Sequence, residues 1–200
     1  MVESFEKIFQ FKILLKNTKP PIWRRIQVPE TYTFWDLHVA IQDAMGWGDC
    51  HLHEFEMWNS WKVTKVNIGI PDDDTGWRDI KPGWEVKISE YFSAENKSAE
   101  YTYDFGDTWR HAVTLEKILS RELNKKYPIC INGKRACPPK DCGGPCVYSE
   151  LLYILAHPKH RRHRELTEWI GKPFGSEDFD PTAVRFDNPR ERLKTLQDFS

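Results

Sequence analysis

The sequence predicts an α+β protein: a β-grasp-like mixed sheet with a packed helix, followed by a helical C-terminal part. Three observations lead to this fold class. Apolar and polar residues alternate over most of the first thirty residues, which is typical of half-buried strands. Apolar residues then recur at helical spacing from residue 34 to 45 before alternation returns at residue 52. Strand, strand, helix, strand is the opening order of a β-grasp.

The first two strands are expected on either side of a proline break. Alternation predicts strands over 9–15 and 22–28, and Asn17–Pro21 separates them because consecutive prolines cannot donate to a sheet ladder. Arg24 falls on the apolar side of the second strand. We therefore expect its guanidinium at the strand edge, or inside, stacked on a Trp or paired with a carboxylate.

A helix is predicted over 34–45, because Thr33 and Asp36 form a capping box and Gly46 suits a left-handed stop. Strands are expected over 52–58 and 61–68. The acidic run 71–79 resembles the start of a calcium loop. We exclude calcium because Gly83 stands where a bidentate Glu is required.

The second half of the chain divides into a strand pair, a loop and helices. Alternation over 101–104 and 109–115 flanks a turn at 105–107, and helices are predicted over 148–156, 165–170 and 190–199. We expect a single domain over 1–200, with a sheet-rich core over about 8–119. A Cys, Pro and Gly loop over 128–146 and a helical part over 147–200 complete it.

Composition limits the class of protein. With 40% hydrophobic residues and a formal charge of -1, the 200-residue chain is long enough for one core and is not a globally basic nucleic-acid binder. It lacks an apolar run of roughly 18 residues, and its start lacks the order of a signal peptide. We expect a cytoplasmic protein, a monomer or weak dimer, without a membrane partner.

Three motifs in order carry a resemblance to a known family. They are Pro20-Pro-Ile-Trp-Arg-Arg25, Tyr103-Asp-Phe-Gly-Asp-Thr-Trp-Arg-His111 and Ala136-Cys-Pro-Pro-Lys-Asp-Cys-Gly-Gly144. With these, the chain resembles the plasmid pRiA4b ORF-3-like family from about Ile8 to Leu193. Members occur on plasmids, beside transposable elements and on chromosomes, so the resemblance implies an association with mobile elements. It implies no particular activity. Lys140 departs from the family, which more often has an acidic residue there.

The first candidate site is the bend of the second motif. Asp104, Asp107 and His111 lie around it, and an alternating strand would point His51 and His53 the same way. If the two strands are neighbours, all five side chains converge. His51, His53 and Asp107 would then supply three metal ligands and leave an open position, as in a metal-dependent hydrolase. The alternative is a set of hydrogen-bonded structural groups.

Two further candidates lie in the C-terminal half. Cys130, Cys137, Cys142 and Cys146 could hold zinc, although we expect no cofactor and favour reduced thiols. In that case Pro138 and Pro139 would hold the loop by docking on exposed tryptophans. The basic run 157–164 contains Lys159, Arg161, Arg162 and Arg164, which could contact nucleic acid or another polyanion, or form a solvated loop.

These observations favour a binding or interaction module without catalysis, whose partner is a protein or a polyanion. A metal-dependent hydrolase is the first alternative. A nucleic-acid-contacting accessory protein is the second.

Overall fold

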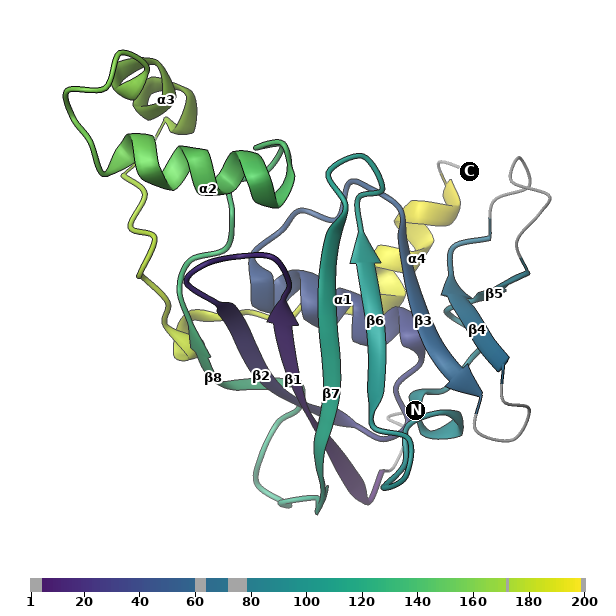
Figure 1. Ribbon diagram of the computed structural model, residues 1–200. Helices are drawn as coiled ribbons and strands as arrows, with labels where there is room; N and C mark the ends of the chain where they lie inside the picture. The colour runs from purple at the N-terminus through teal and green to yellow at the C-terminus, as the bar shows by residue number, and fades with distance from the viewer. Residues whose placement is uncertain (1–4, 60–63, 72–78, 172, 199–200) are drawn as a thin grey trace.

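An eight-stranded sheet forms the body of the protein (Figure 1). The structure is a computed structural model and describes residues 5–59, 64–71, 79–171 and 173–198. The strands are β1 (Lys7–Leu15), β2 (Ile22–Pro29), β3 (His53–Asn59), β4 (Thr64–Gly69), β5 (Ile80–Pro82), β6 (Ser98–Tyr103), β7 (Trp109–Ser120) and β8 (Ile129–Lys134). They lie in the order β5-β4-β3-β6-β7-β1-β2-β8. The β4–β5 pair is parallel and the other pairs are antiparallel, so the sheet is mixed and the α+β class is confirmed.

The likeness to a β-grasp is limited to the opening of the chain. Two strands, helix α1 (Phe34–Met45) and β3 follow one another in the predicted order. However, β1 lies between β2 and β7 and is antiparallel to both. The parallel pairing among the described strands is at the β4–β5 edge.

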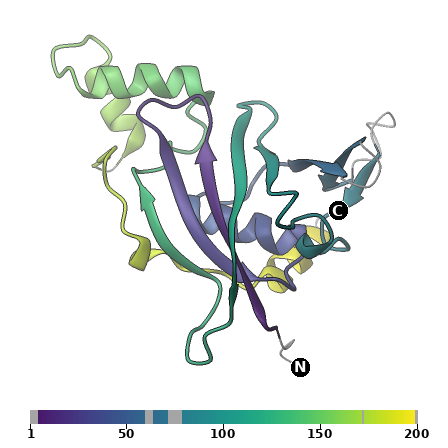
Figure 2. The same ribbon diagram turned by 60° about the horizontal axis from the view of Figure 1, so that its bottom comes forward.

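Helix α1 has the predicted ends. The Thr33 hydroxyl accepts from the Asp36 amide at 3.1 Å, and the Asp36 carboxylate accepts from the Thr33 amide at 2.8 Å. At the other end Gly46 takes a left-handed φ of 85°, which costs glycine little. Helix α1 crosses one face of the sheet (Figure 2) and buries its apolar stripe there.

Aromatic rings fill the space between α1 and the sheet. Phe34 of the helix packs edge-on against Phe55 of β3, with ring centroids 5.2 Å apart. Phe11 of β1 packs against Phe92 at 4.8 Å in the same way. Edge-to-face pairs of this kind add stability beyond the area that they bury. The core therefore accounts for part of the aromatic content of the sequence, whereas other rings, such as Trp58 and Trp169, are exposed.

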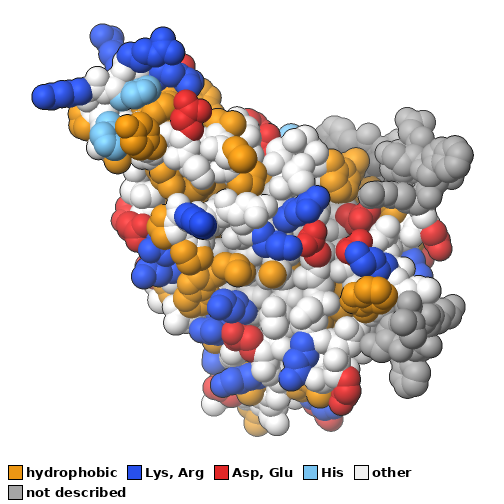
Figure 3. Space-filling model, viewed as in Figure 1, with side chains coloured by type: hydrophobic (Ala, Val, Ile, Leu, Met, Phe, Trp, Pro, Cys, Tyr) orange, Lys and Arg blue, Asp and Glu red, His pale blue; other side chains and the backbone are white. Residues whose placement is uncertain are grey.

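The opposite face of the sheet carries paired charges. Arg25 of β2 makes two hydrogen bonds to Glu116 of β7, at 2.6 and 2.8 Å. Lys16 pairs with Glu100 at 2.6 Å. Acidic and basic side chains are interspersed over this face (Figure 3), so it carries no large field of one sign.

The predicted loop over 128–146 is wrong in its first part, which forms the edge strand β8. Its residues are only partly buried and include Asn132 and Gly133, so the alternation that marks a strand is weak. The strand forms because β2 would otherwise leave its outer backbone groups without partners. The short strand β5 was also not predicted.

Three helices follow the sheet, as expected. Helices α2 (Gly144–Leu155) and α3 (His163–Ile170) form a head that projects from the sheet, and α4 (Pro189–Asp198) returns to the side of α1 (Figure 1). None of the helices among the described residues has the length and apolar content needed to cross a membrane. Most of the predicted acidic loop 71–79 and the start of the strand predicted over 61–68 lie outside the described residues.

Candidate functional site

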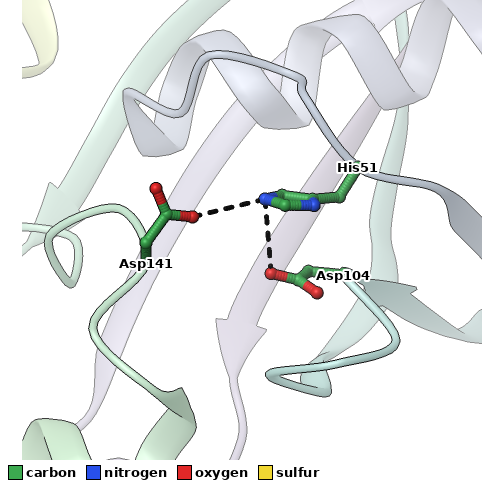
Figure 4. A group of neighbouring side chains, drawn as sticks. All are labelled: His51, Asp104 and Asp141. Atoms are coloured by element: carbon green, nitrogen blue, oxygen red, sulfur yellow. Dashed lines mark hydrogen bonds and ion pairs between the residues drawn. The ribbon is translucent and has the colours of Figure 1, made fainter.

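Three side chains from three loops meet at one end of the sheet. His51 precedes β3, Asp104 follows β6, and Asp141 belongs to the loop before α2. The His51 Nε2 atom lies 3.5 Å from Asp104 Oδ2 and 3.4 Å from Asp141 Oδ1 (Figure 4). In the part of the chain that the structure describes, this is the one group of three His, Cys, Asp or Glu donors lying within 4.8 Å of one another.

The turn between β6 and β7 orients Asp104. Its Oδ1 accepts hydrogen bonds from the amides of Gly106 at 3.0 Å and Asp107 at 3.2 Å. Asp tolerates the left-handed φ of 57° found here because its short side chain can bond to the nearby backbone in this way. The turn therefore occupies one carboxylate oxygen and leaves the other facing His51.

Contacts between two loops bring Asp141 to the site. The Trp47 indole donates to the Pro138 carbonyl oxygen at 3.2 Å, and the Lys140 ammonium donates to the Cys50 sulfur at 3.1 Å. This hydrogen bond raises the pKa of Lys140. The docking of the Pro138 segment on a tryptophan is thus confirmed, although Trp47 is itself buried.

A groove of about 900 Å³ opens beside this group. His51 and Cys50 line it together with Trp35, Trp47 and Asp49, and so does Arg192 of α4. A second hollow of about 630 Å³ adjoins it across Gly46–Gly48 and reaches Lys140 and Asp141. His51 therefore lines the first hollow and Asp141 lines the second.

Asp107 has a different role from the one predicted. Its carboxylate accepts from the Gly143 amide at 3.1 Å, beside the start of α2. A Cβ on Gly144 would lie 2.6 Å from the Asp107 carbonyl oxygen. Asp107 therefore holds the third sequence motif against the second, and it is not one of the three converging donors.

His53 and His111 are core residues. Both are at most 2% exposed, and burial lowers the pKa of each, to about 4 for His111. The His53 ring lies parallel to that of His38 with centroids 3.4 Å apart. The predicted convergence of five side chains is wrong, because β3 begins at His53 and turns that ring inward while His51 stays outside the strand.

The four candidate cysteines do not form a comparable group of donors among the described residues. Cys130 is on β8, Cys146 is exposed on α2, and all five cysteines of the chain are free thiols. Burial raises the pKa of Cys137, and it raises the pKa of Cys142 to about 12. Burial therefore favours the protonated form of both thiols.

The basic run lies at the tip of the α2–α3 head, where Lys and Arg side chains gather (Figure 3). Two of its four cations have acidic partners. Arg162 pairs with Glu150 and Glu165, at 3.5 and 3.3 Å, and Arg164 pairs with Glu168 at 2.7 Å. These glutamates reduce the positive field that a polyanion would meet.

Several residues near the site were not among those predicted from the sequence. Asp141 stands inside the third motif between Lys140 and Cys142. Its carboxylate was the one feature of the sequence that could have indicated a metal ligand there. His38 stands beside the apolar stripe of a helix, where a fully buried imidazole usually has a polar partner. Its partner is Asp49, at 2.8 Å, which lies on the groove wall.

One imidazole and two carboxylates are a usual ligand set for a divalent first-row metal ion. An ion bound at about 2.0–2.2 Å from each donor would hold the donors roughly 3–4 Å apart. The distances from His51 to the two carboxylates already lie in this range. The Asp104 and Asp141 oxygens lie within 4.8 Å of one another, so the three residues could hold an ion if their side chains moved closer together.

The chain is similar to known proteins over nearly its whole length. Residues 7–185 match the family described as Plasmid pRiA4b ORF-3-like protein. A relative named Uncharacterized protein y4hQ, from Sinorhizobium fredii (strain NBRC 101917 / NGR234), is 35% identical over 189 residues, which cover 94% of this chain and 92% of the relative. The crystal structure of a protein of unknown function, MM3350 from Methanosarcina mazei Go1, superposes with a TM-score of 0.86 and 48% identity, covering 92% of this chain and 100% of that one. The family predicted from the three motifs is thus confirmed: the chain belongs to the plasmid pRiA4b ORF-3-like family.

Proposed function

We propose that the protein is a binding module that holds a divalent cation between His51, Asp104 and Asp141. The observation that carries this proposal is the convergence of three donor atoms within 4.8 Å from loops far apart in the sequence. Both carboxylates belong to residues held at a left-handed φ of 57°. The cation would lie beside the groove, where a ligand with oxygen donors could complete its coordination.

The ligand set favours zinc or manganese over calcium and magnesium. Imidazole suits first-row transition metals, whereas calcium and magnesium bind almost entirely through oxygen. Three protein ligands leave at least one coordination position open. The His51 side chain is 37% exposed, so water or a ligand can reach that position.

Titration calorimetry with Zn²⁺ tests the proposal. The wild type should bind one equivalent, and His51→Ala should weaken binding by more than the roughly 10- to 100-fold caused by losing an outer partner of a metal ligand. Asp104→Asn and Asp141→Asn should each weaken it too. His157→Ala, which removes an exposed imidazole from the α2–α3 head, is the matched control and should bind as the wild type does.

Equal zinc binding by His51→Ala and the wild type would contradict the proposal, as would a wild type that binds no zinc. Loss of binding in His157→Ala alone would place the ion on the head instead.

A metal-dependent hydrolase is the second candidate, and the open coordination position favours it. A bound ion could lower the pKa of a coordinated water and generate a nucleophile. The ligands would be His51, Asp104 and Asp141 in place of the predicted His51, His53 and Asp107. Turnover of p-nitrophenyl esters or phosphates that needs added Zn²⁺ and His51 would support the enzyme, and zinc binding without turnover would support the module.

A further inference from the structure

A chain of four hydrogen-bonded side chains runs from the core to the groove. The Gln42 amide donates to the Tyr101 phenol oxygen at 2.8 Å, which lies 2.8 Å from His38 Nδ1. The other ring nitrogen of His38 lies 2.8 Å from Asp49 Oδ1. Gln42, Tyr101 and His38 are fully buried, and the Asp49 side chain at the groove is 10% exposed.

The hydrogen-bonding capacities of these groups give the chain one direction. Because Gln42 donates to the Tyr101 oxygen, the phenol hydrogen is available to His38 Nδ1. The Asp49 carboxylate can only accept, so a neutral His38 ring donates to it from Nε2 and accepts from the phenol at Nδ1. Burial raises the pKa of Tyr101, which keeps the phenol protonated as this arrangement requires. Each member therefore fixes the orientation of the next.

The contacts of the Asp49 side chain also help to hold its backbone. It has a left-handed φ of 51°, a conformation that Asp adopts more readily than most residues other than glycine. Its second carboxylate oxygen lies 3.7 Å from Arg192 Nη1. The His38 ring is in turn held flat against His53, with an angle of 7° between the ring planes. The Asp49 side chain thus contacts His38 in the core and Arg192 on α4.

The loop that Asp49 anchors carries His51. One residue further along, the Cys50 amide donates to the Tyr103 phenol oxygen at 3.0 Å. Tyr101 and Tyr103 are both on β6, and Asp104 follows Tyr103 directly. A single strand therefore sets the position of the His51 loop and of the Asp104 carboxylate.

We infer that Gln42, Tyr101, His38 and Asp49 are positioning residues for the cation site, acting through the loop that carries His51. This inference rests on the proposed function. A chain needed for folding alone would affect the stability of the protein and leave the geometry of the site unchanged. A positioning chain must also change the affinity for the ion.

The test compares Tyr101→Phe with the wild type by Co²⁺ titration, followed through the visible absorption of the bound ion. Tyr101→Phe removes one hydroxyl and no charge. We expect a 10- to 100-fold weaker Kd, the size of effect seen when outer partners of metal ligands are removed. Leu115→Ala, a core change outside the chain, is the control and should lower stability without changing the Kd.

A double variant tests whether the chain acts as one unit. Tyr101→Phe and Asp49→Asn break the same chain, so the double variant should lose little more affinity than the worse single variant. Additive losses would show that the two residues act separately and would overturn the inference.

A second measurement needs no metal. Cys50 and Cys146 are both exposed, and Cys50 lies in the anchored loop whereas Cys146 lies on α2. In Tyr101→Phe, iodoacetamide should alkylate Cys50 several-fold faster than in the wild type, while Cys146 reacts at an unchanged rate. Mass spectrometry of the tryptic peptides separates the two sites.

The outcomes distinguish the inference from the proposed function. If the wild type binds Co²⁺ and Tyr101→Phe changes neither the Kd nor the alkylation of Cys50, the positioning role is overturned and the cation site stands. If the wild type binds no Co²⁺, the proposed function is overturned, and the inference that rests on it is overturned too. Faster alkylation of Cys50 with weaker Co²⁺ binding supports the inference.

Discussion

Arg24 is a buried cation whose hydrogen bonds go to backbone oxygens. It is 1% exposed and donates to the carbonyls of Ala44, Trp23 and Lys134, and its guanidinium lies 3.7 Å from the centroid of the Phe179 ring. Arg24 lies inside and stacks on an aromatic ring, as predicted, but the predicted partner was wrong: the ring is that of Phe179 and not of a tryptophan. The residue joins β2 to α1, to β8 and to the segment before α4.

Replacing Arg24 by Lys should destabilise the fold. A lysine keeps the charge but cannot reproduce the planar fork that reaches three carbonyls, so we expect a loss of about 2–4 kcal/mol in the free energy of unfolding. Urea denaturation measures it. Arg25→Lys is the matched control, because Arg25 is partly exposed and its pair with Glu116 should contribute about 0–1 kcal/mol. Equal losses in the two variants would contradict this account.

His111 should make stability depend on pH. Burial lowers its pKa to about 4, whereas the pKa in the unfolded chain is about 6.5. Between these values the unfolded state binds more protons, so stability is full above about pH 6.5 and falls as the pH drops toward 4. We expect His111 to account for about 2 kcal/mol of the loss between pH 7 and pH 5.

Urea unfolding of His111→Gln at both pH values checks this expectation. The variant keeps a donor for the Tyr101 carbonyl, which His111 Nδ1 approaches at 3.3 Å, but it cannot titrate. Its stability should fall less between pH 7 and pH 5 than that of the wild type. An unchanged difference would assign the pH dependence to other groups, of which buried His53 is the first candidate.

At the scale of elements, the start of α2 depends on a close backbone approach. Gly144 has a φ of 80°, and a Cβ there would lie 2.6 Å from the Asp107 carbonyl oxygen. Gly144→Ala should therefore suffer both backbone strain and a clash. We expect a loss of more than about 2 kcal/mol, since a strained left-handed residue costs of order 1–3 kcal/mol before any clash.

Gly171→Ala separates these two effects. Gly171 also has a positive φ, of 68°, but a Cβ there would lie 3.9 Å from the Glu168 carbonyl oxygen, an ordinary van der Waals contact. This variant should show the strain alone and lose roughly 1 kcal/mol. Denaturant midpoints that fall equally for Gly144→Ala and Gly171→Ala would show that contact with Asp107 is unimportant.

Elements with strong local signals were predicted well. The capping box of Thr33 and Asp36 and the stop at Gly46 set both ends of α1 to the residue. β8 was missed because an exposed edge strand that contains Asn132 and Gly133 has little alternation, and its formation depends on an open edge of β2. A local sequence pattern does not predict pairing with a strand that lies far away in the sequence.

The candidate site was predicted only in part, again because one of its residues is placed by contacts between distant segments. His51 and Asp104 were expected near one another and do lie together. The third donor, Asp141, comes from a loop whose path depends on docking against Trp47 and Asp107. That docking is a tertiary contact, and it cannot be predicted from the sequence pattern of each motif taken separately.

At the scale of the whole molecule, α4 is fastened to α1 by few groups. Arg192 pairs with Asp43 at 2.8 Å and with Asp187, and the Trp35 indole donates to the Pro189 carbonyl oxygen at 2.9 Å. Helix α4 has no fully buried residue. Arg192, Thr195 and Leu196 of α4 line the groove, so these contacts hold part of its wall in place.

Arg192→Met should loosen α4 without unfolding the sheet. We expect faster amide exchange in α4, on the order of tenfold, which corresponds to ~1.4 kcal/mol of lost local stability. Amides of α1 should keep their protection. Lys194→Met, an exposed change in the same helix, is the control. Equal protection of α4 in both variants would show that Arg192 does not hold the helix.

The pairing of β1 has a consequence for synthesis of the chain. β1 lies between β2, which follows it at once, and β7, which begins about a hundred residues later at Trp109. While the ribosome is still making the intervening segment, the first hairpin presents two unpaired edges, a hazard for association with other nascent chains. The edge of β1 closes when β7 emerges, and the edge of β2 closes when β8 follows at Ile129. The early hairpin therefore keeps both of its edges open until more than half of the chain has been made.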